Sequence, residues 1–273
     1  MDKFVLAQFS DTHVCRSGEL LNNGINSNRR LEKAIEYLLN HSIRPDALIV
    51  TGDLVQEGFD EEYAQLKTFL DPVIKRFPVY LCLGNHDSHA SFYRHFSEYP
   101  GIAGSQGLEN WKKGRMTDLA VSYSVELFNS KLVVLDSLQN GSARGLLVGS
   151  QLKNISNLSK DIENQNNILA IHHPPISSGN ATMDTICLEN PETLEKLLNL
   201  FPTFSLILSG HIHRTIISRF AGCTVCICPS TAHLYPIDLT PTNTLPTREQ
   251  PGYFLHRYLE NKGWISQLIS LEL

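Results

Sequence analysis

Side chains that bind metal ions gather at the ends of several apolar runs in this sequence. The first run ends in "SDTH", the second leads into "TGD", the third into "LGNHD", and two later runs end in "IHHPP" and "SGHIH". Carboxylate, amide and imidazole groups without a thiolate suit divalent ions such as Mn, Fe or Zn. The candidate ligands are too many for one ion, so they predict two ions that share a carboxylate: Asp11, His13, Asp53, Asn85, His172, His211 and His213.

The apolar runs themselves are typical of β-strands. Those at 4–10, 46–52, 79–84, 131–137, 167–172 and 205–210 are nearly continuous in Val, Ile and Leu, which favours strands buried on both faces. Two further runs lie at 223–229 and 264–273. In open α/β sheets, ligands bind at the carboxyl ends of the strands. The metal-binding side chains are therefore expected to meet at one edge, with Gly210 allowing a tight backbone before His211.

Helical patterns separate the early strands. Apolar residues recur on one face in residues 26–41, 60–71, 150–162 and 190–201, with Asn26, Ser27 or Asn28 as possible caps of the first helix. This alternation predicts an α/β fold in which helices cover a sheet. The last strands follow one another without helices, so an antiparallel part is expected there. The length and ordinary composition fit a single domain over 1–273.

Two stretches lack a regular pattern. Residues 235–252 contain Pro236, Pro241, Pro246 and Pro251, and residues 101–116 form a second irregular stretch. Long irregular loops in compact domains are more often functional or disordered than idle. We expect the segment 232–252 to form the rim of a pocket or an oligomer contact.

Composition excludes several classes of protein. The 273 residues are 42% hydrophobic and 19% charged, with a net charge of −5, which argues against a dedicated nucleic-acid surface. No apolar run approaches the roughly 20 residues of a membrane span. The first apolar run leads straight into candidate ligands and reads as a strand, so a cytoplasmic location is expected. The six cysteines are expected to be buried thiols rather than metal ligands.

Five motifs in order give the chain a family resemblance. D-x-H at Asp11, GD-x4-G at Gly52, GNHD at Gly84, HHPP at His172 and GH-x-H at Gly210 resemble the calcineurin-like metallophosphoesterases. More narrowly, the chain is similar to bacterial class III cyclic-nucleotide phosphodiesterases and the related glycerophosphodiesterases. The resemblance implies a sandwich of two mixed β-sheets flanked by helices.

The resemblance also implies roles for individual residues. One ion would be bound by Asp11, His13, Asp53 and His213, and the other by Asp53, Asn85, His172 and His211, with Asp53 bridging. His86 would face the substrate phosphate as the catalytic side chain. Three more residues are expected either to contact the substrate or to hydrogen-bond to the metal ligands and hold them in place: His233, His173 and Asp87.

The activity implied is hydrolysis of a small phosphodiester by attack of a metal-bridging hydroxide. A 3′,5′-cyclic nucleotide, cAMP, is the leading substrate, and glycerophosphodiesters are the alternative. A nuclease is less favoured because basic surface is lacking. A non-enzymatic regulator that binds a phosphorylated ligand is also considered, although the complete ligand set speaks against it. A homodimer or larger homo-oligomer is expected.

Overall fold

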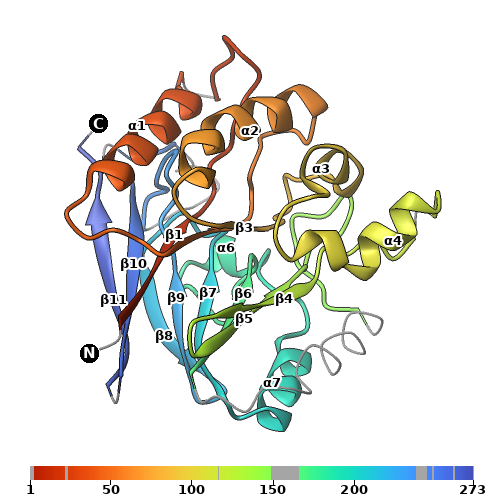
Figure 1. Cartoon of the computed structure of the whole chain (residues 1–273), viewed down its shortest axis with the longest axis vertical. Helices are drawn as coiled ribbons and strands as arrows, with labels where there is room; N and C mark the ends of the chain where they lie inside the picture. Colours follow the sequence, from red (N-terminus) through yellow and green to blue (C-terminus); the bar gives the residue numbers. More distant parts are fainter. Residues whose placement is uncertain are drawn as a thin grey trace.

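The computed structural model describes residues 3–21, 24–115, 117–148, 166–237, 245–247, 249–260 and 262–272. One sheet has the strand order β11-β10-β1-β2-β3 and the other β4-β5-β6-β7-β9-β8 (Figure 1). The first consists of β1 (Lys3–Phe9), β2 (Ala47–Thr51), β3 (Val79–Cys82), β10 (Gly252–Leu259) and β11 (Gly263–Ser270). The second consists of β4 (Tyr123–Leu127), β5 (Ser130–Leu135), β6 (Asn167–Ile171), β7 (Phe204–Ser209), β8 (Ile216–Phe220) and β9 (Cys223–Ile227).

Both sheets are mixed, as predicted. Strands β1, β2 and β3 are parallel to one another, and so are β5, β6, β7 and β9. The antiparallel partners lie at the outer parts of the sheets: β10 and β11 beside β1, β4 beside β5, and β8 beside β9. The antiparallel C-terminal part expected from the sequence is therefore confirmed.

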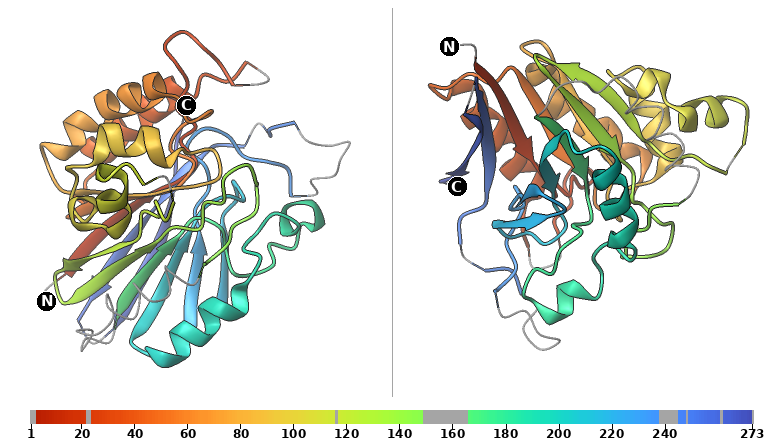
Figure 2. Two further views of the ribbon diagram at one scale, coloured as in Figure 1. Left: turned by 90° about the vertical axis from the view of Figure 1, so that its right-hand side faces the viewer. Right: turned by 90° about the horizontal axis from the view of Figure 1, so that it is seen from below.

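Helices cover the outer faces of the two sheets. Figure 2 shows α1 (Ser27–Asn40) and α2 (Asp60–Ile74) on one side of the sandwich and α7 (Pro191–Leu200) on the other. Strand β5 shows why the sheets are buried on both faces. Leu132 and Val134 belong to the core that includes the other sheet, whereas Val133 and Leu135 pack in the cluster with Leu194 of α7. Alternate side chains of a strand point to opposite faces, so a sandwiched strand must be apolar throughout.

The helix predictions are borne out where the structure describes the chain. Asn26 is the cap of α1, since its side chain accepts a hydrogen bond from the backbone N–H of Arg29. The predicted helix at 150–162 lies outside the described residues. None of the helices in the described ranges has the length and apolar character that a membrane crossing requires.

The prediction of an irregular stretch at 101–116 was wrong for its central part. A 3-10 turn (Ile102–Gly104) and helix α4 (Gln106–Lys112) lie there. The side chain of Ser105 caps α4 by accepting from the N–H of Leu108, whose own side chain is buried. A short helix with one buried turn gives too few repeats for a recognisable pattern. The same applies to α3 (His89–Phe96) and α6 (Ala181–Asp184), which the sequence did not predict.

Candidate metal centre

The predicted ligands lie in tight turns just beyond the carboxyl ends of the strands. The turn after β1 runs beside the turn after β2, with Asp11 N–H donating to Gly52 O at 3.0 Å and His13 N–H to Asp53 O at 3.0 Å. Five candidate ligands have left-handed backbones: Asp11 (φ 50°), His13 (φ 44°), Asp53 (φ 47°), His211 (φ 72°) and His213 (φ 55°). Such conformations cost free energy in non-glycine residues and cluster at functional sites.

Glycines allow these turns to approach one another closely. A Cβ atom on Gly210 would lie 1.9 Å from Ser10 Oγ, and one on Gly84 would lie 2.3 Å from Asp53 Oδ1. Both distances are far below van der Waals contact. The glycines of the GNHD and GH-x-H motifs are therefore required by packing between turns that come from different strands.

A first group of ligand atoms comes from three turns. One atom each from Asp11, His13, Asp53 and His213 lies within 4.8 Å of the others. His213 Nε2 is 3.0 Å from His13 Nε2 and 3.4 Å from Asp11 Oδ1, and His13 Nε2 is 3.8 Å from Asp53 Oδ2. All four residues are buried. Buried carboxylates and imidazoles converging on one point are suited to bind a divalent ion.

A second group lies against the other oxygen of Asp53. His172 Nε2 is 3.4 Å from Asp53 Oδ1 and 3.3 Å from Asn85 Oδ1. His172 also forms a cluster of possible ligand atoms within 4.8 Å together with His173 and His211. The two oxygens of Asp53 therefore face two different groups of ligands, which is the arrangement that a shared carboxylate needs.

Hydrogen bonds on the opposite ring nitrogens orient three of the histidines. His172 Nδ1 lies 2.7 Å from Thr51 O, His213 Nδ1 lies 3.1 Å from His233 O, and His13 Nδ1 lies 3.0 Å from Gln56 Oε1. With a proton on each Nδ1, all three imidazoles point Nε2 toward the centre. This is the outer support typical of histidine ligands in metal sites. In addition, His211 Nε2 is buried and has no hydrogen-bond partner, so the residues present fit a bound cation.

Burial also keeps most of these imidazoles neutral, which is the protonation state that binds metal ions. It holds the pKa of His13 and of His213 well below the usual value and lowers the pKa of His211 to about 3. His172 differs: burial would lower its pKa, but the carboxylates of Asp53 and Asp11 and the hydrogen bond to Thr51 O together raise it to about 9. Burial likewise opposes ionisation of Asp53, yet His172 and His86 keep its pKa well below the usual range. Protons and metal ions therefore compete for His172.

His86 and His233 lie around the first group of ligands. The ring of His86 is 4.8 Å from that of His13, and its Nδ1 lies 2.7 Å from Gln56 O, so Nε2 is the nitrogen that can reach a substrate. The backbone N–H of His86 donates to Asp53 Oδ1 at 2.9 Å. The ring of His233 is 4.5 Å from that of His213, and its Nδ1 is buried without a hydrogen-bond partner.

Asp87 points away from the ligands and holds two turns together. Its Oδ2 accepts from the N–H of Gly84 at 2.8 Å and of Leu54 at 3.1 Å, and its Oδ1 accepts from Tyr63 Oη at 2.9 Å. Leu54 follows Asp53, and Gly84 precedes Asn85. Burial raises the pKa of Asp87 to about 7, whereas the three donors favour the carboxylate. His173 likewise bonds away from the centre, with Nδ1 2.8 Å from Ser137 Oγ.

Several supporting residues carried no signal in the sequence. Gln56 orients both His13 and His86, and Tyr63 reaches Asp87 from the first turn of α2. Ser27 Oγ donates to His13 O at 2.7 Å from the start of α1. Only the position of Gln56, three residues after Asp53, placed it near a ligand. The others depend on tertiary packing of a helix against a strand-end turn.

Comparisons with known proteins agree with this geometry. The family model described as calcineurin-like phosphoesterase matches residues 4–215. A glycerophosphodiester phosphodiesterase (GpdQ) of Enterobacter lignolyticus is 29% identical over 267 residues, covering 98% of this chain and 91% of the relative. A cAMP/cGMP dual specificity phosphodiesterase of Mycobacterium tuberculosis is 28% identical over 240 residues, covering 87% of this chain and 70% of the relative.

Solved structures support the fold. A dimetal phosphatase from Danio rerio superposes with a TM-score of 0.67 at 14% sequence identity, covering 98% of this chain and 99% of the other. At this identity the likeness concerns the arrangement of the two sheets and their helices.

Proposed function

The chain belongs to the calcineurin-like phosphoesterase family, and we propose that it uses two divalent metal ions to hydrolyse a small phosphodiester to a monoester and an alcohol. The observation that carries this proposal is the position of Asp53, whose oxygens lie 3.4 Å from His172 Nε2 and 3.8 Å from His13 Nε2. A carboxylate between two groups of imidazoles is the feature that a two-metal phosphoesterase requires.

We assign one ion to Asp11, His13, Asp53 and His213, and the other to Asp53, Asn85, His172 and His211. His172 is preferred to His173 because His172 Nε2 lies beside both Asn85 and Asp53. When bound, two such ions lower the pKa of a water molecule and offset charge on the phosphoryl oxygens. Mn, Fe and Zn all tolerate this ligand set.

Charge at the centre favours an anionic substrate. Two divalent ions contribute +4 and the carboxylates of Asp11 and Asp53 contribute −2, which leaves about +2. The chain as a whole has a net charge of −5, so attraction of the substrate is local to the centre.

We assign His86 to the substrate phosphate. Its Nδ1–H donates to Gln56 O, so Nε2 carries a proton only in the imidazolium form, which can donate to a phosphoryl oxygen or to the leaving oxygen. Burial disfavours that form, but the Asp53 carboxylate and the hydrogen bond to Gln56 O raise the pKa of His86 above its usual value. Asp53 Oδ1 accepts from the backbone of His86, which fixes the imidazole relative to the ligands. General acid catalysis by a positioned histidine contributes typically ~10²–10⁴-fold.

A 3′,5′-cyclic nucleotide, cAMP, is the substrate we favour, in keeping with relatives that are named as cyclic-nucleotide phosphodiesterases. Glycerophosphodiesters are the second candidate, because the relative named as a glycerophosphodiester phosphodiesterase aligns with 98% of this chain. The same centre serves both substrates, since each presents one phosphodiester with a single negative charge.

The setting of the enzyme is also part of the proposal. All six cysteines are free thiols, which supports a reducing compartment such as the cytoplasm. Exposed apolar side chains on the edge strands, Ile217 of β8 and Ile265 and Leu268 of β11, support a homodimer or larger assembly. Sedimentation velocity across a range of concentrations measures the assembly directly.

A substrate panel on protein of known metal content tests the activity. Protein loaded with Mn²⁺ is assayed under identical conditions with cAMP, sn-glycero-3-phosphoethanolamine and bis-p-nitrophenyl phosphate. We expect turnover of the activated diester and of at least one of the two natural diesters. If protein that holds two metals per chain hydrolyses none of the three, the proposed activity is wrong and a ligand-binding role is favoured.

A further inference from the structure

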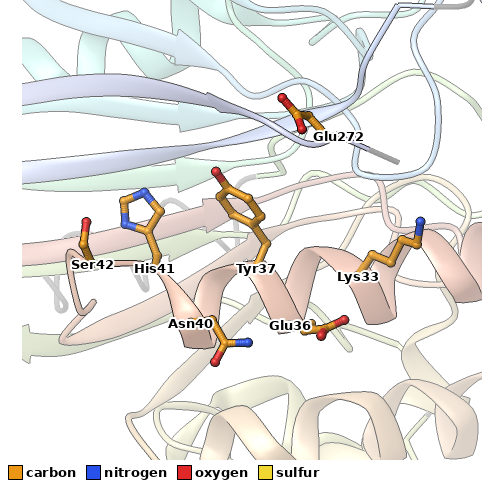
Figure 3. Close-up of a pocket in the computed structure, with 7 residues that line it drawn as sticks. All are labelled: Lys33, Glu36, Tyr37, Asn40, His41, Ser42 and Glu272. Atoms are coloured by element: carbon orange, nitrogen blue, oxygen red, sulfur yellow. The ribbon is translucent and has the colours of Figure 1, made fainter.

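The cavities of the described part of the chain differ in their relation to the metal centre. A polar cavity of about 510 Å³ lies between α1 and Glu272 (Figure 3). Its lining mixes the opposite charges of Lys33, Glu36 and Glu272 and includes no predicted site residue. A smaller cavity of about 190 Å³ is lined by Tyr235 and by residues that neighbour His213, so it lies beside the centre.

Tyr235 lines this cavity and also contacts His213 and His233. Its ring centroid lies 4.8 Å from that of His213 and 5.0 Å from that of His233. Ile212, which stands between two predicted ligands in the GH-x-H turn, lines the same cavity. A diester with its phosphate on the His213 side of the centre would place one of its alcohol groups next to this cavity.

The lining is largely apolar. Besides Tyr235 and Ile212, it includes Met183, Ile216 and Pro236. Binding sites lined in this way favour flat or apolar groups, with orientation fixed by a few polar atoms. At ~30 Å³ for each water in the liquid, the cavity has room for about six waters, which is the scale of a small ring system.

Most of the polar side chains in the lining are already hydrogen-bonded within the protein. Asn180 accepts from the N–H groups of Thr182 and Met183 at 3.0 and 3.2 Å and donates to Ile237 O at 3.1 Å. Ser178 Oγ donates to an oxygen of Asp184 at 2.6 Å.

Arg214 is held in the same way. Its Nη1 donates to Tyr235 O at 3.0 Å and to Glu249 at 2.8 Å. Thr215 is the remaining polar side chain of the lining. The hydroxyl groups of glycerol would lose their hydrogen bonds to water in this cavity and find few protein groups to replace them, which costs binding free energy. A planar base needs only one or two polar contacts at its edge.

We propose that this cavity binds the planar base of a cyclic nucleotide, with Tyr235 as its aromatic contact. The inference rests on the proposed phosphodiesterase activity and chooses between its two substrate classes. The base occupies the cavity while the phosphate reaches the metals past the ring of Tyr235. Tyr235 is a specificity residue in this account, and the metal ligands serve either substrate.

Binding of adenosine tests the cavity without phosphate or turnover. Calorimetry and saturation-transfer NMR are applied to metal-loaded wild-type protein, to Tyr235→Ala and to the matched control Tyr37→Ala, whose ring lies on α1 away from the cavity. We expect Tyr235→Ala to weaken adenosine binding about tenfold, within the range for a lost base–aromatic contact, and Tyr37→Ala to bind like wild type. Equal binding by wild type and Tyr235→Ala overturns the proposal.

A second pair of variants keeps Tyr235 in place beside His213. Ile216→Phe fills the cavity, and Ile217→Phe adds the same bulk on the exposed opposite face of β8. We expect Ile216→Phe to raise the KM for cAMP about tenfold at unchanged metal content, with the KM for sn-glycero-3-phosphoethanolamine and the behaviour of Ile217→Phe unchanged. An equal rise in KM for both diesters overturns the assignment of the cavity to a base.

The two proposals fail in different ways. Absence of turnover on the activated diester in protein with two metals contradicts the phosphodiesterase activity, whatever the adenosine result. Turnover of glycerophosphodiesters together with no detectable adenosine binding leaves the activity standing and contradicts the base pocket alone.

Discussion

Among the described residues, the metal centre and a second buried cluster of polar side chains differ in how far the protein itself satisfies them. The first is the metal centre at the strand ends. The second, the sheet cluster, lies within the five-stranded sheet and consists of Gln8, Thr51, His256 and Ser266. Gln8 Nε2 donates to Thr51 Oγ1 and Ser209 O, both at 3.0 Å, and Gln8 Oε1 lies 3.0 Å from His256 Nε2. His256 Nδ1 lies 2.7 Å from Ser266 Oγ.

The sheet cluster is complete without a ligand, and the metal centre is not. None of the four sheet-cluster side chains leaves a buried polar atom without a partner, whereas His173, His211 and His233 each do. The metal centre also has left-handed backbones, and the sheet cluster lies on regular strands. Buried polar groups normally have partners, so an unsatisfied set that converges on one point indicates a ligand-binding site.

The largest effect is expected from Asp53→Asn. The amide lacks the negative charge that both groups of ligands face, so both metal ions bind weakly. Without the ions, the transition state loses several kcal/mol of stabilisation, which corresponds to a fall in kcat of at least ~10³-fold. Metal content by mass spectrometry and turnover of bis-p-nitrophenyl phosphate measure it. Asp60→Asn, the same change at an exposed carboxylate paired with Arg94, is the control. Full metal content in Asp53→Asn would contradict the shared position.

A smaller effect is expected from His86→Ala. The imidazole lies beside the ligands but is not assigned to a metal, so kcat should fall ~10²-fold while both ions remain bound. Parallel measurement of metal content and kcat separates the two roles. Loss of the metals, with activity per bound metal unchanged, would show that His86 is a ligand or supports one.

Asp87→Asn tests whether the hydrogen bonds of Asp87 hold the turns that carry Asp53 and Asn85. The amide keeps the size of the side chain but has one acceptor oxygen, so it can accept either from the two backbone N–H groups or from Tyr63, and not from all three donors. Loss of such support typically lowers metal affinity ~10–100-fold. Competition with a fluorescent chelator measures the affinity, and Tyr63→Phe, which removes one of the three donors, should have the weaker effect. Unchanged affinity in Asp87→Asn would mean that the turns hold their positions without it.

In the sheet cluster, substitution should change stability and leave catalysis alone. His256→Leu leaves the buried Gln8 Oε1 without a partner and leaves Ser266 Oγ with only the Cys226 thiol at 3.6 Å, which costs about 1–3 kcal/mol. Urea unfolding of metal-free protein measures the free energy of unfolding. Activity per bound metal should equal that of wild type. A large loss of that activity would break the distinction between the two clusters.

The pH dependence of stability gives the finest test. Burial lowers the pKa of His256 to about 3, from a usual value of 6.5. As the pH falls below 6.5, the unfolded chain takes up a proton that the folded chain does not accept until about pH 3, so the free energy of unfolding falls with decreasing pH in this window. For one group the slope reaches ~1.4 kcal/mol per pH unit.

His256→Leu removes that contribution. Urea unfolding of metal-free wild type and variant is measured at about pH 6 and pH 5. The free energy of unfolding of wild type should exceed that of the variant by less at pH 5 than at pH 6, the change being roughly 1.4 kcal/mol per pH unit. A difference that stays constant across the window would place the titration elsewhere in the molecule.

The contrast between the clusters also explains what the sequence could predict. Asp11, Asp53, Asn85 and His211 follow apolar strands directly, and parallel strands bring their carboxyl ends together, so the composition of the centre was predictable. The residues of the sheet cluster carry no such pattern, because Gln8 and His256 meet only when β10 pairs beside β1. Gln56 and Tyr63 escaped prediction for the same reason: their roles depend on how a turn and a helix pack.

The pairing of β1 with β10 has a consequence for biosynthesis. Once a ribosome has translated the chain as far as His213, every predicted ligand exists, yet β1 still lacks its antiparallel neighbour, which runs from Gly252 to Leu259. The N–H of Thr231 and the hydroxyl of Ser230, which hold the backbone of Ser10 and Asp11, also come later. We therefore expect the nascent protein to capture its cations only after residues 252–259 have left the exit tunnel and paired with β1.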